Sequence, residues 1–280
     1  MTDYLRPRSL DDALRARGEH PDYLILAGGT DVMVGHREEP VGVIDLFGLA
    51  PLIGVDRTDD GAVRIGAATT YRELLGSELI ARCAPALAAA AREVGAVQIQ
   101  ARGTIGGNVG TSSPVGDTLP VLLALDASVE VASRGGSRTV PYEDFCTGYR
   151  TTALATDELI VAVRIPASAA DTRQFWRKVG TRRAQSISKI VVAAAARLGD
   201  DGAVANARIG LGAVRERPIR ARAAEAELIG QVPSDEVADR VRDAVQHDIS
   251  PIDDVRSSAD YRRAVAGNVV ARFVRWLATG

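Results

Sequence analysis

Residues 104–117 read Thr-Ile-Gly-Gly-Asn-Val-Gly-Thr-Ser-Ser-Pro-Val-Gly-Asp and lie between two apolar segments that are typical of helices. Four glycines and four hydroxyl side chains leave little that can pack in a core. The N–H groups and hydroxyls of such a loop can instead bind an anionic, sugar-bearing ligand. Asp117 has two interpretations here: it caps the next helix, predicted at 119–125, or it accepts hydrogen bonds from ribose hydroxyls.

A second glycine turn supports a nucleotide site. Residues 26–31 read Leu-Ala-Gly-Gly-Thr-Asp and follow the apolar run 23–25, which is typical of a buried strand. Taken alone, this segment is more simply a strand-to-helix turn capped by Thr30. Neither segment has the Gly-x-Gly-x-x-Gly fingerprint or the Lys-Ser/Thr of a P-loop. Together, the two turns indicate a nucleotide that is held from two sides.

Composition restricts the partners and the location. The 280 residues are 46% hydrophobic and 25% charged, as is typical of a soluble globular protein. The formal net charge is −2 and no Lys/Arg block occurs, so we expect no binding to nucleic acid or to a membrane surface. No apolar run could span a bilayer and no signal peptide is apparent, so we expect a cytoplasmic protein without a membrane span.

Cysteine and histidine usage indicates that this chain holds no metal by itself. Cys83 and Cys146 form no Cys-x-x-Cys pair, so they provide no ligand set for an iron–sulfur cluster or a structural zinc. His20, His36 and His247 are scattered and begin no metal motif or catalytic triad. We therefore predict no metal ligands and no catalytic side chain, and expect the chemistry to belong to a bound cofactor.

Capping and turn signals divide the first half of the chain into helices and strands. Ser9 should begin a short helix, and Thr70 with Glu73 has the spacing of a capping box. Hairpins are predicted around residues 59–61 and 134–136. The other predicted elements are strands at 23–26, 43–46 and 159–165 and helices at 85–94 and 119–125.

A shift in composition at 167–173 predicts a domain boundary. Three strands are predicted beyond it, at 174–180, 190–198 and 204–214, and three helices follow, at 219–229, 234–247 and about 259–278. Strands followed by helices favour an α+β layer.

The two glycine segments, in this order and spacing, resemble those of the FAD-binding (medium) subunit of the molybdenum hydroxylases. The opening Arg6-Pro7, the run 65–70, the stretch from Gln98 to Asn108 and the tail 260–263 fit the same family. Within the family, residues 26–31 and 68–70 look most similar to the bacterial xanthine dehydrogenase branch.

The resemblance implies the fold. It is an α+β fold with a two-part FAD-binding domain of the vanillyl-alcohol-oxidase (PCMH) type over residues 1–170, with subdomains at about 1–56 and 57–170. A smaller α+β C-terminal domain over 171–280 would combine a three-stranded antiparallel sheet with a helical bundle.

The resemblance also implies site residues. The FAD diphosphate would bind the first turn, which comprises Ile25, Leu26, Ala27, Gly28, Gly29, Thr30 and Asp31. The second segment would contribute Thr104, Ile105, Gly106, Gly107, Asn108, Thr111 and Ser113. Asp117 matches a carboxylate near the adenosine ribose, Ile160 an aliphatic residue packed on the cofactor, and Lys178 a residue near the flavin. A surface lysine on an edge strand is the other interpretation of Lys178. Two positions depart from the family pattern: Val94, where some members have an aromatic residue, and Ser186, where Asp is common.

The function implied by the resemblance is electron transfer. Electrons would pass from two [2Fe-2S] clusters on a small subunit, which receive them from a molybdenum–pterin centre on a large subunit, through FAD to NAD⁺. The complex would be a heterotrimer, possibly doubled, that oxidises xanthine or hypoxanthine. The alternatives are a carbon monoxide, aldehyde or N-heterocycle dehydrogenase with a quinone or other acceptor, and a scaffold subunit without flavin.

Overall fold

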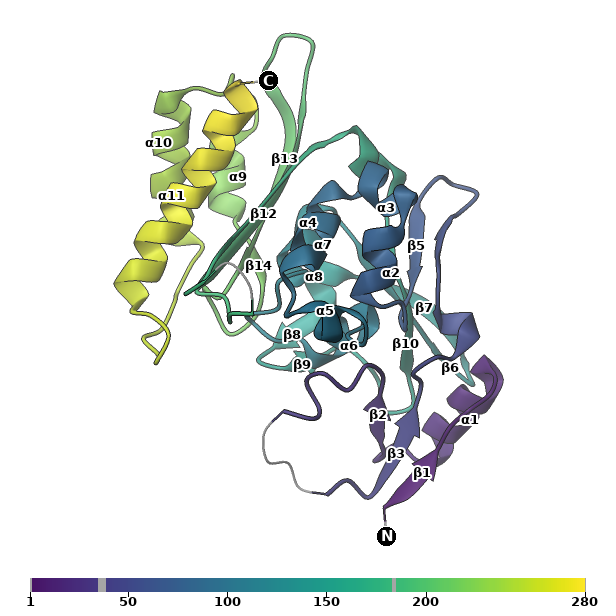
Figure 1. The fold of residues 1–280 in the computed structure, drawn as a ribbon. Helices are drawn as coiled ribbons and strands as arrows, with labels where there is room; N and C mark the ends of the chain where they lie inside the picture. Colours follow the sequence, from purple (N-terminus) through teal and green to yellow (C-terminus); the bar gives the residue numbers. More distant parts are fainter. Residues whose placement is uncertain (1, 35–38, 183–184, 280) are drawn as a thin grey trace.

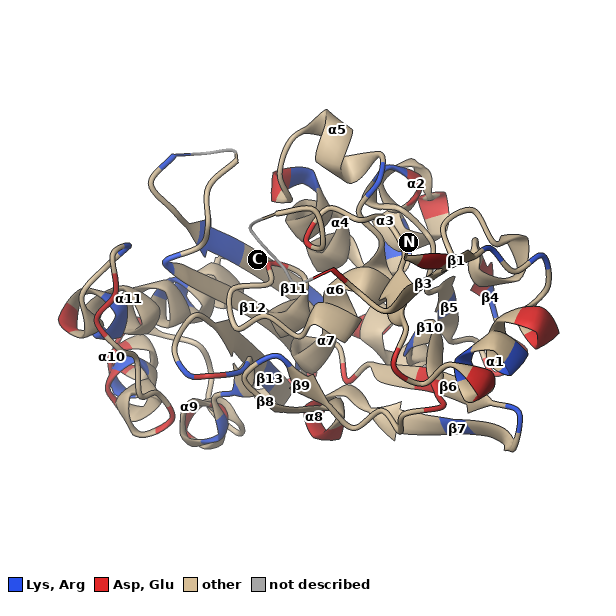
Figure 2. Ribbon diagram, turned by 90° about the horizontal axis from the view of Figure 1, so that it is seen from below, with Lys and Arg blue, Asp and Glu red and all other residues tan. Residues whose placement is uncertain are grey.

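The computed structural model describes residues 2–34, 39–182 and 185–279, so His36 lies outside the described residues. Three units follow one another along the chain. Figure 1 shows the purple N-terminal unit, a central unit in blue and teal, and a C-terminal unit in green and yellow. Figure 2 shows basic and acidic residues interspersed over all three.

The N-terminal unit is a small parallel sheet with one helix. Strands β1 (Asp3–Leu5), β3 (Gly42–Asp45) and β2 (Leu24–Leu26) pair in the order β1-β3-β2. Helix α1 (Leu10–Glu19) begins at Ser9, whose hydroxyl accepts the N–H of Asp12, as the sequence predicts. The 3₁₀ helix η1 (Ala50–Leu52) leads out of this unit.

The central unit contains a five-stranded antiparallel sheet in the order β4-β5-β10-β6-β7. Its strands are β4 (Val55–Arg57), β5 (Val63–Gly66), β6 (Ser128–Ser133), β7 (Gly136–Pro141) and β10 (Leu159–Ile165). Both predicted hairpins are confirmed as β4–β5 and β6–β7. A short hairpin, β8 (Cys146–Gly148) and β9 (Thr151–Thr152), precedes β10.

Seven helices accompany this sheet in the described part of the unit. They are α2 (Tyr71–Gly76), α3 (Glu78–Cys83), α4 (Pro85–Glu93), α5 (Val97–Gln100), α6 (Ile105–Thr111), α7 (Leu119–Ala124) and α8 (Tyr142–Phe145). The predicted capping box at Thr70 is present, because Thr70 and Glu73 each accept the other's N–H. Helix α4 starts at Pro85, where a missing N–H costs nothing.

The C-terminal unit is an antiparallel sheet with helices on one face. After the 3₁₀ helix η2 (Ala167–Asp171) come β11 (Arg173–Val179), β12 (Ile190–Leu198), β13 (Val204–Gly212) and β14 (Ile219–Arg220). The helices are α9 (Arg222–Leu228), α10 (Asp235–Ala244), the 3₁₀ turn η3 (Val245–His247) and α11 (Ala259–Ala278). The predicted sheet thus gains a fourth strand. Ile219 and Arg220 were predicted to begin a helix, but they pair with Leu211 and Gly210.

Strand β12 joins the C-terminal unit to the rest of the molecule. Its even-numbered residues from Ile190 to Ala196 pack in the core beneath α9–α11. Ala193 and Ala195, on the opposite face, belong to the core of the central unit, where α7 covers the sheet. Burial on both faces explains why this strand has a continuous apolar sequence rather than an alternating one.

Candidate functional site

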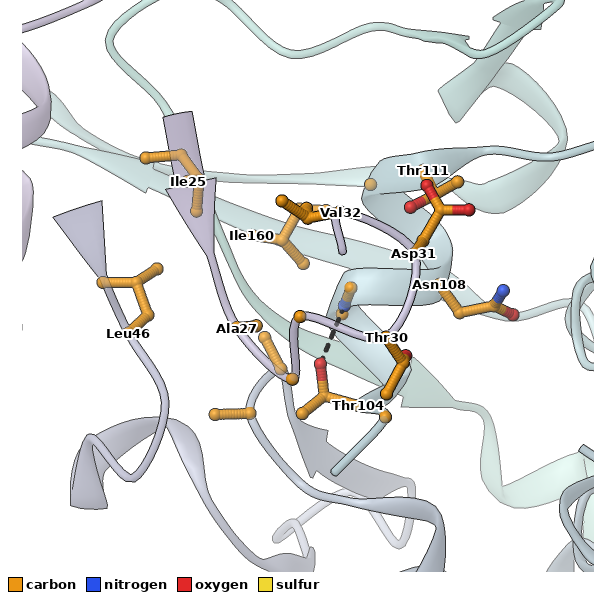
Figure 3. Close-up of a pocket in the computed structure, with 18 of the residues that line it drawn as sticks. Ile25, Ala27, Thr30, Asp31, Val32, Leu46, Thr104, Asn108, Thr111 and Ile160 are labelled. Atoms are coloured by element: carbon orange, nitrogen blue, oxygen red, sulfur yellow. Dashed lines mark hydrogen bonds between the residues drawn. The ribbon is translucent and has the colours of Figure 1, made fainter. Parts of the chain in front are cut away.

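A cavity of about 590 Å³ lies between the N-terminal unit and the central unit, and its volume is within the usual range of ligand sites. Its walls are the turn after β2, helix α6 with the loop that follows it, and the start of β10 (Figure 3). Most predicted site residues line it: Ile25, Ala27, Gly28, Gly29, Thr30, Asp31, Thr104, Gly106, Gly107, Asn108, Thr111, Ser113, Asp117 and Ile160. Leu26, Ile105 and Lys178 do not.

The turn after β2 presents free backbone donors to this cavity. Within the described residues, the N–H groups of Gly28, Gly29 and Thr30 donate to no protein acceptor. The turn closes when the N–H of Met33 donates to the carbonyl of Gly29. Residues 31–34 form a turn and a bend rather than a helix, so Thr30 caps no helix within the described residues. Consecutive unpaired N–H groups in a concave turn are suited to an anion.

Gly28 lets this turn approach the backbone at Arg102, just before the second glycine segment. A Cβ atom built on Gly28 would lie 2.0 Å from the carbonyl oxygen of Arg102. Gly29 has φ +75°, a left-handed conformation that glycine adopts without strain. The two glycines therefore have different roles: one permits close contact and the other permits the bend.

The second glycine segment differs from the predicted loop, because residues 105–111 form helix α6. Thr104 caps it by accepting the N–H of Gly107, and Ile105 and Val109 are fully buried beneath it. The N–H of Ile105 donates to Thr69 O and that of Gly106 to Ala67 O. These N–H groups are not available to a ligand.

The glycines of α6 instead allow close packing. A Cβ atom on Gly106 would lie 2.6 Å from the carbonyl oxygen of Ala67. Gly107 and Gly110 present only backbone to the cavity. The helix can therefore form one wall without filling the space.

Polar and apolar side chains occupy different parts of the wall. Figure 3 shows Ile25, Leu46 and Ala27 on one side, Asn108 and Thr111 on the other, and Ile160 between them. The Asn108 Oδ1 accepts the hydroxyl of Thr118, which orients the amide. This division matches a ligand that has both an aromatic ring system and a hydroxylated, charged portion.

Asp117 and Lys178 form a buried ion pair beside the cavity. Lys178 Nζ lies 2.6 Å from Asp117 Oδ2, with side-chain exposures of 3% and 11%. Ser188 also donates to the Asp117 carboxylate, and Lys178 donates to the carbonyl of Glu93. Burial raises the pKa of Asp117, while the Lys178 ammonium opposes this shift.

Two interpretations from the sequence are therefore wrong. Asp117 is not a helix cap, since Thr118 is the N-cap of α7 and no side chain caps that end. Lys178 is not a surface residue, although β11 is an edge strand, because its side chain is buried. Lys178 reaches the cavity only through Asp117.

Several residues that line the cavity were missed from the sequence, namely Arg17, Tyr71, Arg150 and Glu158. Arg150 pairs with Asp31 across the mouth, and the buried Nε of Arg17 has no hydrogen-bond partner in the described protein. These residues come from four separate elements, and no spacing in the sequence connects them. Of the two departures from the family pattern, Val94 lines the cavity, and the hydroxyl of Ser186 donates to Arg182 O.

Family models match both parts of the chain. The model described as FAD binding domain in molybdopterin dehydrogenase matches residues 1–168. The model described as CO dehydrogenase flavoprotein C-terminal domain matches residues 176–277.

Curated relatives match over nearly their whole length. The putative xanthine dehydrogenase FAD-binding subunit XdhB of Escherichia coli K12 is 33% identical over 268 residues, which cover 94% of this chain and 91% of that protein. The nicotine 6-hydroxylase medium subunit of Paenarthrobacter nicotinovorans is 32% identical, with coverage of 97% and 95%.

Solved structures share the fold. A chain of carbon monoxide dehydrogenase from Hydrogenophaga pseudoflava superposes with a TM-score of 0.93 at 31% identity, covering 99% of this chain and 98% of that one. A chain of quinoline 2-oxidoreductase from Pseudomonas putida 86 gives a TM-score of 0.92 at 26% identity, with coverage of 100% and 98%.

None of the helices in the described residues is long and apolar enough to cross a membrane. The match of the FAD-binding model to more than half of the chain, together with relatives above 30% identity, shows the family. The chain belongs to the FAD-binding medium subunits of the molybdenum hydroxylases.

Proposed function

We propose that this chain carries FAD in the cavity between its first two units and serves as the electron-transfer subunit of a xanthine-oxidising complex. The proposed position of FAD rests above all on the turn formed by Gly28, Gly29 and Thr30. These three residues line a cavity of suitable size, their N–H groups donate to no acceptor in the described protein, and a side chain at Gly28 has no room. Family membership supports FAD as the ligand.

The residues present fit the parts of FAD. The N–H groups of the turn would hold the diphosphate, whose charge they match. The hydroxylated part would meet Asn108, Thr111 and Ser113, which line the wall opposite the apolar residues. Asp117, held by Lys178, would accept hydrogen bonds from ribose hydroxyls. Ile160 would pack on the ring system. The remaining predicted site residues, Leu26, Ile105 and Lys178, would support these contacts from behind.

The bound flavin supplies the redox chemistry, and the protein supplies binding, orientation and shielding from water. The side chains that line the cavity would position the cofactor and take no part in bond making themselves. The side-chain contacts on Asp117 and Asn108 hold these groups in one orientation before the ligand arrives.

We further propose partner chains that carry the other redox centres. A small subunit would hold two [2Fe-2S] clusters and a large subunit the molybdenum–pterin, in a heterotrimer that can dimerise. The relatives are named as medium chains or subunits, and the Hydrogenophaga pseudoflava enzyme is described as lacking the Mo-pyranopterin moiety of its molybdenum cofactor. Cys83 and Cys146 are both buried and are not joined in a disulfide.

NAD⁺ is the proposed acceptor and xanthine or hypoxanthine the proposed substrate. The two Escherichia coli xanthine dehydrogenase subunits, at 33% and 32% identity, support this choice. A second candidate, an N-heterocycle dehydrogenase, is supported by the similar identity of the nicotine 6-hydroxylase subunit. A carbon monoxide or aldehyde substrate is a weaker alternative. A scaffold without flavin is disfavoured by the free donors of the glycine turn.

The test is an assay of the whole complex, purified with this chain tagged. NADH formation with xanthine or hypoxanthine, at a higher kcat/KM than with nicotine, quinoline or carbon monoxide, supports the proposal. Turnover of an N-heterocycle with a quinone analogue but not with NAD⁺ would favour the second candidate. A complex that contains no FAD would contradict both.

A further inference from the structure

Arg150 connects the central unit to the glycine turn across the mouth of the cavity. It lies in the turn between β8 and β9, and its guanidinium makes two contacts with Asp31. Nη1 lies 3.2 Å from Oδ2 and Nη2 lies 3.2 Å from Oδ1. Both residues line the cavity. Asp31 directly follows the three residues whose N–H groups are free.

Folding stability does not explain this arrangement. The two side chains are 39% and 42% exposed, and ion pairs as exposed as this contribute little to stability. Arg150 also has φ +53°, a left-handed conformation that is unfavourable for a residue other than glycine. A strained backbone that presents a charged side chain to a cavity suggests a functional reason.

We propose that Arg150 is a positioning residue for the dinucleotide. By gripping Asp31 with two hydrogen bonds, it fixes the turn so that the N–H groups of Gly28, Gly29 and Thr30 converge on one place. It also brings a positive charge next to the position proposed for the diphosphate. This inference rests on the placement of FAD given above.

The physical effect is preorganisation. A turn that is already held in the binding conformation loses less entropy when the ligand binds, so the ligand binds more tightly and leaves more slowly. Lysine keeps the charge but cannot make the planar two-point contact with a carboxylate. Arg150→Lys should therefore retain only part of the effect, and Arg150→Gln none of it.

The experiment measures the release of FAD from the full-length chain by the rise in flavin fluorescence. We expect Arg150→Gln to release FAD about fivefold faster than the unchanged protein, and Arg150→Lys to lie between them. Arg150→Gly should release FAD as fast as Arg150→Gln while the thermal midpoint of the apoprotein stays equal or rises, because glycine relieves the left-handed strain. High salt should reduce the difference between variants.

Two controls separate the possible causes. Arg275→Gln removes a similarly exposed arginine, paired with Asp235 on α10, and should leave FAD release unchanged. Asp31→Asn removes the partner, so that adding Arg150→Gln to it should change the rate little further.

The outcomes discriminate between the two proposals. If the unchanged protein takes up no FAD, the placement of FAD fails. If it binds FAD but all Arg150 variants release it at the unchanged rate, only the role of Arg150 is overturned. The role is also overturned if every variant that releases FAD faster has a lower thermal midpoint. It is likewise overturned if Arg150→Gln speeds FAD release as much in the Asp31→Asn protein as in the unchanged protein.

Discussion

A single hydrogen atom at Gly28 decides how closely the first glycine turn approaches the backbone at Arg102, just before the second glycine segment. Because a Cβ atom there would lie 2.0 Å from the Arg102 carbonyl oxygen, Gly28→Ala must push the turn away from Arg102. We expect an overpacking cost on the order of 1–3 kcal/mol in unfolding free energy. We also expect the variant to bind FAD more weakly under conditions where its apoprotein is still folded. Titration of the folded apoprotein with FAD measures this loss of affinity.

Gly76→Ala is the matched control for this substitution. Gly76 ends helix α2, and a Cβ atom there meets nothing within 4 Å. That variant should keep both stability and FAD affinity. Full FAD binding in Gly28→Ala would show that the turn does not hold the diphosphate.

The second prediction concerns the buried ion pair of Asp117 and Lys178. Lys178→Met leaves the Asp117 carboxylate buried without its cation, which should cost about 3–5 kcal/mol of unfolding free energy. The double variant Asp117→Asn with Lys178→Met removes both charges and should recover much of that loss. Urea unfolding of the single and double variants measures the difference. A loss in the double variant equal to the sum of the losses in Lys178→Met and in Asp117→Asn would mean that the pair is not coupled.

The double variant also tests the contact of Asp117 with FAD. Once stability is restored, the amide oxygen of the double variant can still accept a ribose hydroxyl, but the acceptor no longer carries a charge. FAD should then bind more weakly by on the order of 1 kcal/mol, the difference between a charged and a neutral hydrogen bond. Unchanged affinity would restrict Asp117 to a structural role.

Among the elements, α11 depends on a charged cluster at its start. Asp254 accepts the N–H groups of Arg256 and Ser257 and pairs with the buried Arg262 of α11 at 2.7 Å. Partial burial raises the pKa of Asp254, but the Arg256 N–H and the two guanidiniums outweigh it and lower this pKa to about 2. The carboxylate therefore stabilises the fold fully above its unfolded pKa of 3.8, and this contribution is lost as pH falls through about 2.

Asp254→Asn should reduce the unfolding free energy at neutral pH by on the order of 1–3 kcal/mol. The fall in stability between about pH 4 and pH 2 should become shallower than in the unchanged protein. Acid titration followed by circular dichroism measures both effects. Asp200→Asn, on the exposed turn between β12 and β13, is the control. An unchanged acid profile in Asp254→Asn would contradict the assignment.

Local signals predicted most elements correctly. Ser9 and Thr70 cap helices at the positions where their side chains can accept an N–H, and this requires only residues three positions away. Helix α6 was missed because its glycines and hydroxyls have low helix propensity and no apolar period. Its stability comes from packing on Ala67 and Thr69, which are distant in the sequence. Strand β14 was missed because two residues are too few to show the alternation of apolar and polar residues that indicates a strand.

In the whole molecule, the C-terminal sheet packs directly against α7 of the central unit. A Cβ atom on Gly210 of β13 would lie 2.1 Å from the Pro120 carbonyl oxygen of α7. Gly210→Ala should therefore separate the two surfaces and cost on the order of 1–3 kcal/mol, seen as a lower transition in calorimetry. Gly135→Ala, in the exposed β6–β7 turn, should have no such effect, since its nearest neighbour is 3.5 Å away. An unchanged transition temperature for Gly210→Ala would mean that the two surfaces can adjust to the added methyl group.

Most of the helices and strands, both glycine segments, the class of ligand and the family could be inferred from the amino-acid sequence. Those features depend on residues that are neighbours in the chain: caps, turns, alternating patterns and a motif. Which glycine segment has free N–H groups could be seen only in the folded chain, since that depends on what Ala67 and Thr69 accept. The burial of Lys178, its ion pair with Asp117 and the contact of Arg150 with Asp31 could also be seen only in the folded chain. Such contacts join residues 61 and 119 positions apart, and burial and charge pairing at that range follow from packing rather than from local sequence.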